Sequence, residues 1–219
     1  MKVALVTKKE KLHVNHVIEL TNNIFTDVSV FSGDRLDPFP KKLEEETFDL
    51  IISYIGPWVI PESVLNKTKK WNINFHPGPP EYPGIGCFNF ALYNNETSFG
   101  TTAHLMQPKV DTGRIIDIDR FDIVKNENVE SLSIKTYDSL FRLYKNIIKK
   151  IAQKDKIKFL DLEWKRLPYK RSDLEKLCFL DLKMSEEEFE KIIRCTYYPG
   201  APAPYIVING YKFEYNPDR

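Results

Sequence analysis

Four short apolar runs in the N-terminal part of the chain constrain its fold most strongly. They lie at residues 2–7, 28–31, 48–53 and 71–75 and are rich in β-branched and aromatic residues. The run at 2–7 is followed by residues 12–20, whose apolar members recur at helical spacing. Strands that alternate with helices are typical of parallel sheets, so this part of the chain predicts an α/β arrangement.

From Gly100 onwards the pattern changes. Two expected strands follow one another directly, at 101–106 and 114–124, and the loop between them holds Asp111. Residues 129–151 then carry apolar side chains on one face of a long amphipathic helix. We therefore predict an α/β fold with a twisted mixed sheet that is covered by helices.

The segment 154–170 is charged and irregular, and we place a domain boundary within it. This divides the chain into a main domain at residues 1–157 and a C-terminal extension at residues 158–219. Both parts follow from local patterns, since we find no internal repeat and no low-complexity segment.

The extension is expected to contain a helix and a β-hairpin. Ser185-Glu-Glu-Glu188 is a capping box and predicts a helix that runs to about Arg194. Residues 205–215 predict a hairpin in which Asn209-Gly210 suits a type I′ turn. A lone hairpin is marginal in water, so we expect it to pack on the main domain or on a partner subunit.

Composition and charge argue against several classes of protein. The 32 basic and 31 acidic residues nearly cancel, so net charge does not indicate a nucleic-acid surface. Apolar runs stay below the roughly 20 residues of a membrane span, and the N-terminus lacks a signal-peptide pattern. Cys87, Cys178 and Cys195 are odd in number and lack metal-ligand spacing. We expect a reduced, cytoplasmic protein without metal, nucleic-acid partner or membrane anchor.

An asparagine and a histidine stand two residues apart where the fourth apolar run ends. Residues two apart in a strand point to the same face, so Asn74 and His76 should project together. The Pro/Gly-rich loop at 77–84 cannot continue the strand, and strand mouths in α/β proteins are where ligands usually bind. Downstream, His104 and Asp111 accompany them, and an amide, an imidazole and a carboxylate together suit acyl transfer.

As a set these motifs resemble those of the folate-dependent formyltransferases. The matching residues are Asn74-x-His76-Pro77, Gly84, Gly100-x-Thr102-x-His104 and Asp111-x-Gly113-x-Ile115. The resemblance runs from the first strand to about Ile116 and returns at residues 193–200. It implies the Rossmann-like fold of that superfamily, 10-formyltetrahydrofolate as co-substrate, and Asn74, His76 and Asp111 as catalytic residues.

The residue types agree with that chemistry. An amine that attacks a formyl carbon forms an intermediate with negative charge on oxygen, which the Asn74 amide or a protonated His76 can hold. His76 can instead accept the proton that the amine sheds. Asp111 can orient His76, stabilise its cation or relay the proton through water, and the sequence leaves these roles open. We interpret His104 as structural.

The resemblance also implies binding residues. Two loops, at 57–61 and 107–110, are similar to the family's pterin loops, and the expected folate contacts are Trp58, Val59, Ile60, Gln107 and Val110. The loop after His76 supplies the expected acceptor contacts, which are Gly78, Tyr82 and Gly84.

The loop from His76 to Phe90 looks most like that of the nucleotide-sugar N-formyltransferases. This implies a dTDP-linked 3- or 4-amino-dideoxy sugar as acceptor, a role in surface polysaccharide such as lipopolysaccharide O-antigen, and a homodimer. A glycinamide ribonucleotide formyltransferase is the alternative, although this chain has Thr7-Lys8-Lys9-Glu10 where such enzymes usually carry a Gly-rich loop. A methionyl-tRNA formyltransferase would be expected to carry a basic C-terminal domain. A folate-binding module without catalysis is a further alternative.

Overall fold

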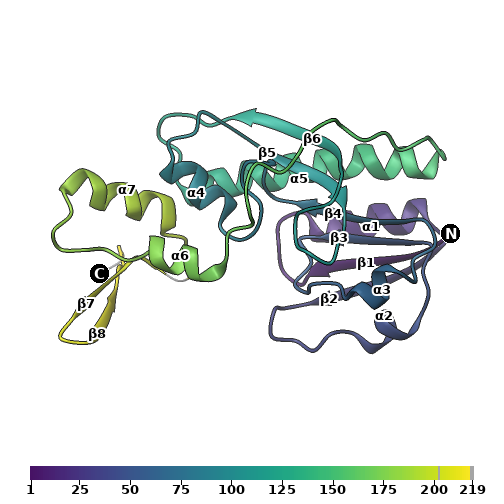
Figure 1. Ribbon diagram of the computed structural model, residues 1–219, viewed down its shortest axis with the longest axis horizontal. Helices are drawn as coiled ribbons and strands as arrows, with labels where there is room; N and C mark the ends of the chain where they lie inside the picture. Colours follow the sequence, from purple (N-terminus) through teal and green to yellow (C-terminus); the bar gives the residue numbers. More distant parts are fainter. Residues whose placement is uncertain (202, 218–219) are drawn as a thin grey trace.

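A computed structural model of the chain describes residues 1–201 and 203–217. In chain order, its elements are β1 (Lys2–Lys8), α1 (Val14–Ile24), β2 (Asp27–Gly33), α2 (Lys41–Glu45), β3 (Leu50–Tyr54), α3 (Glu62–Leu65), β4 (Trp71–His76), α4 (Cys87–Tyr93), β5 (Ser98–Leu105), β6 (Ile115–Asp122), α5 (Val129–Ala152), α6 (Arg171–Leu177), α7 (Glu186–Thr196), β7 (Tyr205–Ile208) and β8 (Tyr211–Glu214). The predicted fold class, a mixed sheet with helices and a C-terminal hairpin, is confirmed (Figure 1).

The main sheet has six strands in the order β2-β1-β3-β4-β5-β6. The first four are parallel, whereas β5 runs antiparallel to both β4 and β6. Strand β4 is therefore the seam between the parallel and antiparallel parts of the sheet. The carboxyl ends of β1, β3 and β4 meet at one edge, and His76 ends β4 there.

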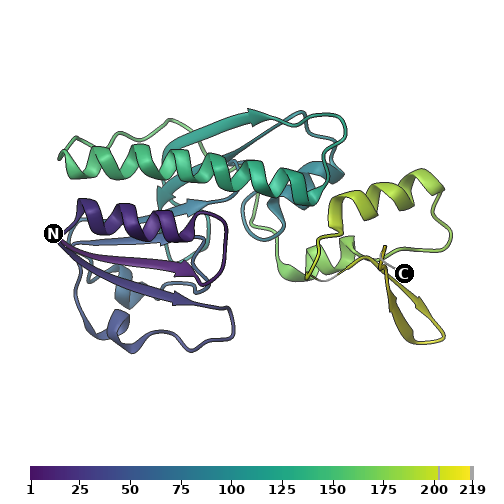
Figure 2. The same ribbon diagram turned by 180° about the vertical axis from the view of Figure 1, so that it is seen from behind.

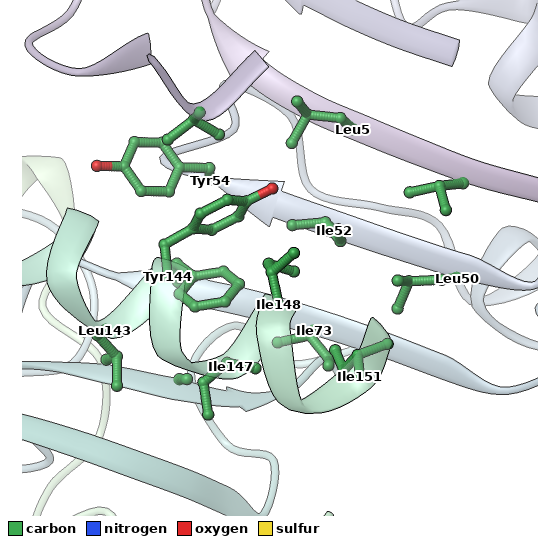
Figure 3. Packing of buried hydrophobic residues seen from close by; sticks show 14 of the residues in the cluster. Leu5, Leu50, Ile52, Tyr54, Ile73, Leu143, Tyr144, Ile147, Ile148 and Ile151 are labelled. Carbon is green, nitrogen blue, oxygen red and sulfur yellow. The ribbon is translucent and has the colours of Figure 1, made fainter. Parts of the chain in front are cut away.

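Helices α1 and α5 cover one face of the sheet, as Figure 2 shows from behind. The apolar stripe of α5 faces strand residues of alternating position, so a continuous core forms between helix and sheet. Figure 3 shows this packing, in which the labelled residues are Leu143, Tyr144, Ile147, Ile148 and Ile151 of α5 and Leu5, Leu50, Ile52, Tyr54 and Ile73 of the sheet.

The other face of the sheet is covered only in part. Helices α2 and α3 lie over the half that is formed by β1, β2 and β3, where Leu43, Phe48 and Val64 are buried. No sequence periodicity predicts α2 or α6, because helices of 5 and 7 residues are shorter than the window in which periodicity is visible. Loops, and not helices, cover the half at β4 and β5, and the candidate site lies there.

The extension projects to one side of the main domain (Figure 1). The capping box is confirmed, since Glu188 N donates to Ser185 Oγ at 3.3 Å and Ser185 N donates to Glu188 Oε2 at 3.2 Å. Asn209 and Gly210 have φ values of 50° and 84°, as a type I′ turn requires.

The hairpin packs on the rest of the extension. It does not pack on the main domain, where the first of the two expectations placed it. Its first strand exchanges backbone hydrogen bonds with residues after α6, where Leu180 N donates to Tyr205 O and Tyr205 N donates to Cys178 O. All four residues of β8 are exposed. An apolar hairpin in this position leaves its outer face uncovered.

The irregular segment 154–170 runs back across the main domain. Leu160 N donates to Ile115 O at 2.9 Å, and Lys165 N donates to Pro80 O at 2.9 Å. The Phe159 ring packs on Trp71 with centroids 6.2 Å apart. The predicted boundary at 157/158 thus falls in a stretch that contacts the main domain. Among the described residues, no helix has the length and apolarity that a bilayer crossing needs.

Candidate active site

Three polar side chains lie side by side across the middle of the sheet. Ser53 of β3 is in register with Asn74 of β4, which is in register with His104 of β5. Residues paired in this way share one face of the sheet. The intervening residue, Phe75, belongs to the core on the opposite face. The expectation that Asn74 and His76 project from one face is therefore confirmed.

Asp111 connects these side chains. Its Oδ1 lies 3.2 Å from His104 Nε2 and 3.4 Å from Asn74 Nδ2. Its Oδ2 lies 3.3 Å from His76 Nδ1 and accepts a hydrogen bond from Gly84 N at 2.8 Å. The three residues predicted to be catalytic thus converge, with the carboxylate at the centre.

The loop between β5 and β6 holds Asp111 in an unusual backbone conformation. Its φ is 49°, in the left-handed region that Asp and Asn tolerate better than other side chains. Leu105 N donates to Arg114 O at 3.0 Å and closes the base of the loop. Gly113 packs against β5 so closely that a Cβ there would lie 1.8 Å from Leu105 O. In residues 111–113, Asp111 therefore supplies the carboxylate, and Gly113 allows the loop to pack closely against β5.

The pKa of Asp111 reflects opposing effects. Burial raises it, but the charge of His76, the hydrogen bond and charge of His104, and the Gly84 amide outweigh burial and lower the pKa to about 2. Asp111 is consequently a carboxylate at neutral pH, and it is only 4 % exposed. A buried anion of this kind is stable only while its partners stay in place.

The two imidazoles differ in what they can still do. His76 Nε2 lies 2.9 Å from Tyr82 O and must donate to it, because a carbonyl only accepts. A second proton on Nδ1 would let His76 donate to Asp111 as well. His104 Nδ1 donates to Leu105 O at 2.8 Å, while its Nε2 lies 3.0 Å from Asn74 Nδ2. An unprotonated Nε2 accepts from the Asn74 amide, and a protonated one donates to Asp111.

A cavity of about 160 Å³ opens beside this cluster. Its polar lining includes Asn74, His104 and Asp111, but His76 is not part of it. All five expected folate contacts line the cavity, namely Trp58, Val59, Ile60, Gln107 and Val110. The lining also includes Ser53, Gly56, Pro57, Leu65 and Met106. The structure brings these residues together from two loops, and their role in binding stays a prediction.

Comparison with known proteins assigns the family. The family model described as Formyl transferase matches residues 3–148, which is more than half of the chain. The chain belongs to the formyl transferase family.

Curated relatives of this formyl transferase include enzymes with different acceptors. A GDP-perosamine N-formyltransferase from Brucella melitensis is 26 % identical over 95 % of this chain and 80 % of its own length. A methionyl-tRNA formyltransferase from Mycoplasmopsis pulmonis is 25 % identical over 95 % of this chain and 73 % of its own. Family membership alone therefore does not identify the amine.

Solved structures share the fold. A sugar N-formyltransferase from a Shewanella species superimposes with a TM-score of 0.77 at 18 % identity and covers 98 % of this chain and 96 % of its own. An N-formyltransferase from Helicobacter canadensis, in complex with folinic acid and dTDP-3-aminofucose, has a TM-score of 0.73 at 21 % identity and covers 96 % and 85 %. At these identities the likeness establishes the fold.

The expected acceptor contacts are not at the cavity of this formyl transferase. Tyr82 is buried, and its hydroxyl donates to Glu96 at 2.7 Å. Gly84 holds Asp111 through its amide, with a φ of 89°. Gly78 O accepts from Thr102 Oγ1 at 2.8 Å. The structure gives all three a part in shaping the loop after His76, and direct contact with an acceptor stays a prediction for them.

Sequence reasoning missed other residues of the site. Ser53 is the one polar residue in the run Leu50-Ile-Ile-Ser53, and a lone polar residue in an apolar strand is the signal that would have found it. Its register with Asn74 is shown only by the structure. Trp164 donates from Nε1 to Gly113 O at 2.9 Å, although it comes from the irregular segment 154–170. No local signal points to it, since the contact spans 51 residues. Among the described residues, no group of three His, Cys, Asp or Glu is arranged to hold a metal ion.

Proposed function

We propose that this formyl transferase moves the formyl group of 10-formyltetrahydrofolate to the primary amine of a nucleotide-linked amino-dideoxy sugar. One observation carries the proposal: Asn74, His104 and Asp111 line a cavity whose other walls include Trp58, Ile60 and Val110. The flat face of a pterin ring suits such walls, and the polar end of the cavity is where the reactive carbon would lie.

In this proposal the Asn74 amide donates to the oxyanion that forms when the amine attacks. Its Nδ2 carries two N–H groups. When His104 Nε2 is protonated and donates to Asp111 at 3.2 Å, one Asn74 N–H donates to Asp111 at 3.4 Å and the other is free to donate to the oxyanion. Asp111 holds His76, which either donates to the same oxygen or accepts the proton of the amine. Because His76 lies outside the cavity lining, either role requires His76 to give up its bond to Tyr82 O or to act through water.

A cluster of cations supports a nucleotide as the carrier of the amine. Burial lowers the pKa of Lys8, and the nearby charges of Lys11 and Arg171 lower it further. Lys11 and Tyr198 line one hollow, and Arg171 and Tyr198 line another. Lys8 ends β1 at the same sheet edge as His76. We infer that this cluster receives the diphosphate, and that dTDP is the nucleotide, as in the Helicobacter complex.

The decisive experiment incubates the protein with 10-formyltetrahydrofolate and dTDP-, UDP- or GDP-linked amino sugars, and mass spectrometry then looks for one added formyl group. Glycinamide ribonucleotide and methionyl-tRNA belong in the same screen as competing acceptors. Formylation of a dTDP-linked 3- or 4-amino sugar supports the proposal. Formylation of glycinamide ribonucleotide alone, or release of formate without any formylated acceptor, overturns it.

The basic cluster has a test of its own. In Arg171→Ala, KM for the nucleotide sugar should rise while KM for the folate stays near that of wild type. If Arg171→Ala and the wild type have the same KM for the nucleotide sugar, the diphosphate binds elsewhere. We further propose that the product serves surface polysaccharide such as O-antigen, and that the enzyme works in the cytoplasm as a homodimer.

A further inference from the structure

We propose that Trp164 is a positioning residue of the formyl-transfer centre, where its indole holds the imidazoles of His76 and His104 against Asp111. The inference rests on the proposed function, because it concerns the same reaction. It assigns a catalytic consequence to the segment 154–170, which the sequence presents as a linker.

The Trp164 side chain contacts both imidazoles and the loop that carries Asp111. The Trp164 ring meets His104 at a centroid distance of 4.9 Å and an interplanar angle of 84°, and it meets His76 at 5.7 Å and 73°. Edge-to-face contacts of this kind favour one ring orientation over others. The indole N–H donates to Gly113 O at 2.9 Å, two residues beyond Asp111. The imidazoles and the loop that carries the carboxylate are thus joined through Trp164.

The position of Trp164 is itself determined from both sides. Leu160 N bonds Ile115 O at the start of β6, and Lys165 N bonds Pro80 O in the loop after His76. Trp164 lies between these two anchors in the chain. Because the anchors belong to different elements of the main domain, the indole is held even though its segment has no regular structure.

Trp164 lies outside the cavity. The indole does not line it, whereas His104 and Asp111 do. Trp164 thus contacts the two imidazoles without lining the cavity proposed for the folate carrier. Its effect must act through His76 and His104, which makes it a positioning residue and not a catalytic one.

The physical role follows from burial. His76, His104 and Asp111 are 4 %, 2 % and 4 % exposed. Ion pairs are stronger in such surroundings, and buried pairs depend on well-fixed geometry. Without the indole, water would reach the imidazoles and their rings would gain rotational freedom. The titratable groups that face this cluster are these three residues and Cys87, whose thiol donates to Pro77 O at 2.8 Å.

The test compares Trp164→Ala, Trp164→Phe and a control, Phe159→Leu. Phe159 belongs to the same segment but packs on Trp71 and Arg114, away from the imidazoles. We expect Trp164→Ala to lower kcat by about 10²-fold with KM for the folate unchanged, since small misplacements of reacting groups cost this much. Trp164→Phe keeps a ring on the imidazoles and should restore most of the lost kcat. Phe159→Leu should keep wild-type kcat.

A second measurement does not depend on activity. The imidazole N–H protons that His76 and His104 donate to backbone carbonyls should give slowly exchanging proton NMR signals in the wild type. Trp164→Ala should broaden them through exchange with water, and Phe159→Leu should not. If Trp164→Ala fails to fold, kcat and the N–H signals are compared between Trp164→Phe and Phe159→Leu instead.

Three outcomes overturn the inference: wild-type kcat with intact N–H signals in Trp164→Ala, equal losses in Trp164→Ala and Phe159→Leu, or no rescue by Trp164→Phe. If the wild type itself formylates no amino sugar, the proposed function fails while the NMR comparison still decides the role of Trp164.

Discussion

Asp111 illustrates how much one residue of this formyl transferase has to satisfy. Its two carboxylate oxygens meet His76, His104, Asn74 and the Gly84 amide, while its backbone adopts a positive φ. A short side chain with two acceptor oxygens is suited to both demands. The same residue therefore supports the geometry of the site and the electrostatics that the proposed reaction requires.

Asn74→Ala should lower kcat for formyl transfer by about 10²–10³-fold, which is the cost of removing one preorganised oxyanion donor. Steady-state kinetics with the preferred amino sugar measures this. Asn72→Ala is the matched control, since Asn72 lies on the same face of β4 but donates to Leu65 O at 2.9 Å, away from the reaction. A kcat near that of wild type in Asn74→Ala would refute the assigned role.

Asp111→Asn should destabilise the fold at neutral pH, because the native state lowers the pKa of Asp111 from 3.8 to about 2. A lowered carboxyl pKa contributes stability that is complete above the unfolded value and disappears as pH falls through the folded value. The difference in unfolding free energy between wild type and variant should therefore shrink between about pH 4 and 2. Urea unfolding at a series of pH values checks this, and a difference that stays constant over that range would contradict it.

At the scale of elements, β4 determines where the chemistry lies. It pairs in parallel with β3 and antiparallel with β5, which sets Ser53, Asn74 and His104 in one row. The turn after β5 then returns Asp111 to the end of that row, and Trp164 of the segment 154–170 donates to Gly113 O in the same loop. The site is thus assembled by strand register and by two loops that contact each other through Gly113 and Trp164.

Gly113→Ala should damage the site through the backbone. A Cβ at position 113 would lie 1.8 Å from Leu105 O, and a backbone atom cannot move aside as a flexible side chain can. The loop that carries Asp111 must therefore shift, and we expect kcat to fall by about 10²-fold or more together with a lower Tm. Thr112→Ser is the control, because it keeps the hydroxyl that bonds Lys109 O. Steady-state kinetics and thermal unfolding of both variants test this prediction. A Gly113→Ala enzyme with normal kcat would show that the close packing of this loop on β5 is dispensable.

On the scale of the whole molecule, the extension ends in a hairpin whose outer face is uncovered. Tyr211 and Phe213 are 72 % and 53 % exposed, although both are large apolar side chains. Exposed apolar surface of this kind is typical of interaction sites. The hairpin does not pack on its own main domain, and the second expected position, on a partner subunit, stays a prediction.

We therefore expect the wild type to be a dimer and the double variant Tyr211→Glu, Phe213→Glu to be a monomer, because two carboxylates would be buried without partners in the interface. Size-exclusion chromatography with light scattering measures this. Lys212→Ala lies between the two substitutions but points to the other face of the hairpin, and it should stay dimeric. A wild type that is monomeric at high concentration would refute the hairpin interface.

Local patterns were enough for most of the elements. The strands at 2–8, 50–54 and 71–76, the capping box at Ser185 and the Asn209-Gly210 turn all follow from neighbouring residues, and so does the shared face of Asn74 and His76. Periodicity and turn chemistry act over a few residues, so they are legible in the sequence itself.

Contacts between distant residues were decided only by the tertiary structure. The meeting of His104 with Asn74, the burial of Tyr82 and the placement of Trp164 on the imidazoles depend on strand register and chain path. An irregular charged segment has no periodicity from which its course could be predicted. Its path is set by backbone hydrogen bonds at Leu160 and Lys165, which leave no mark on side-chain identity.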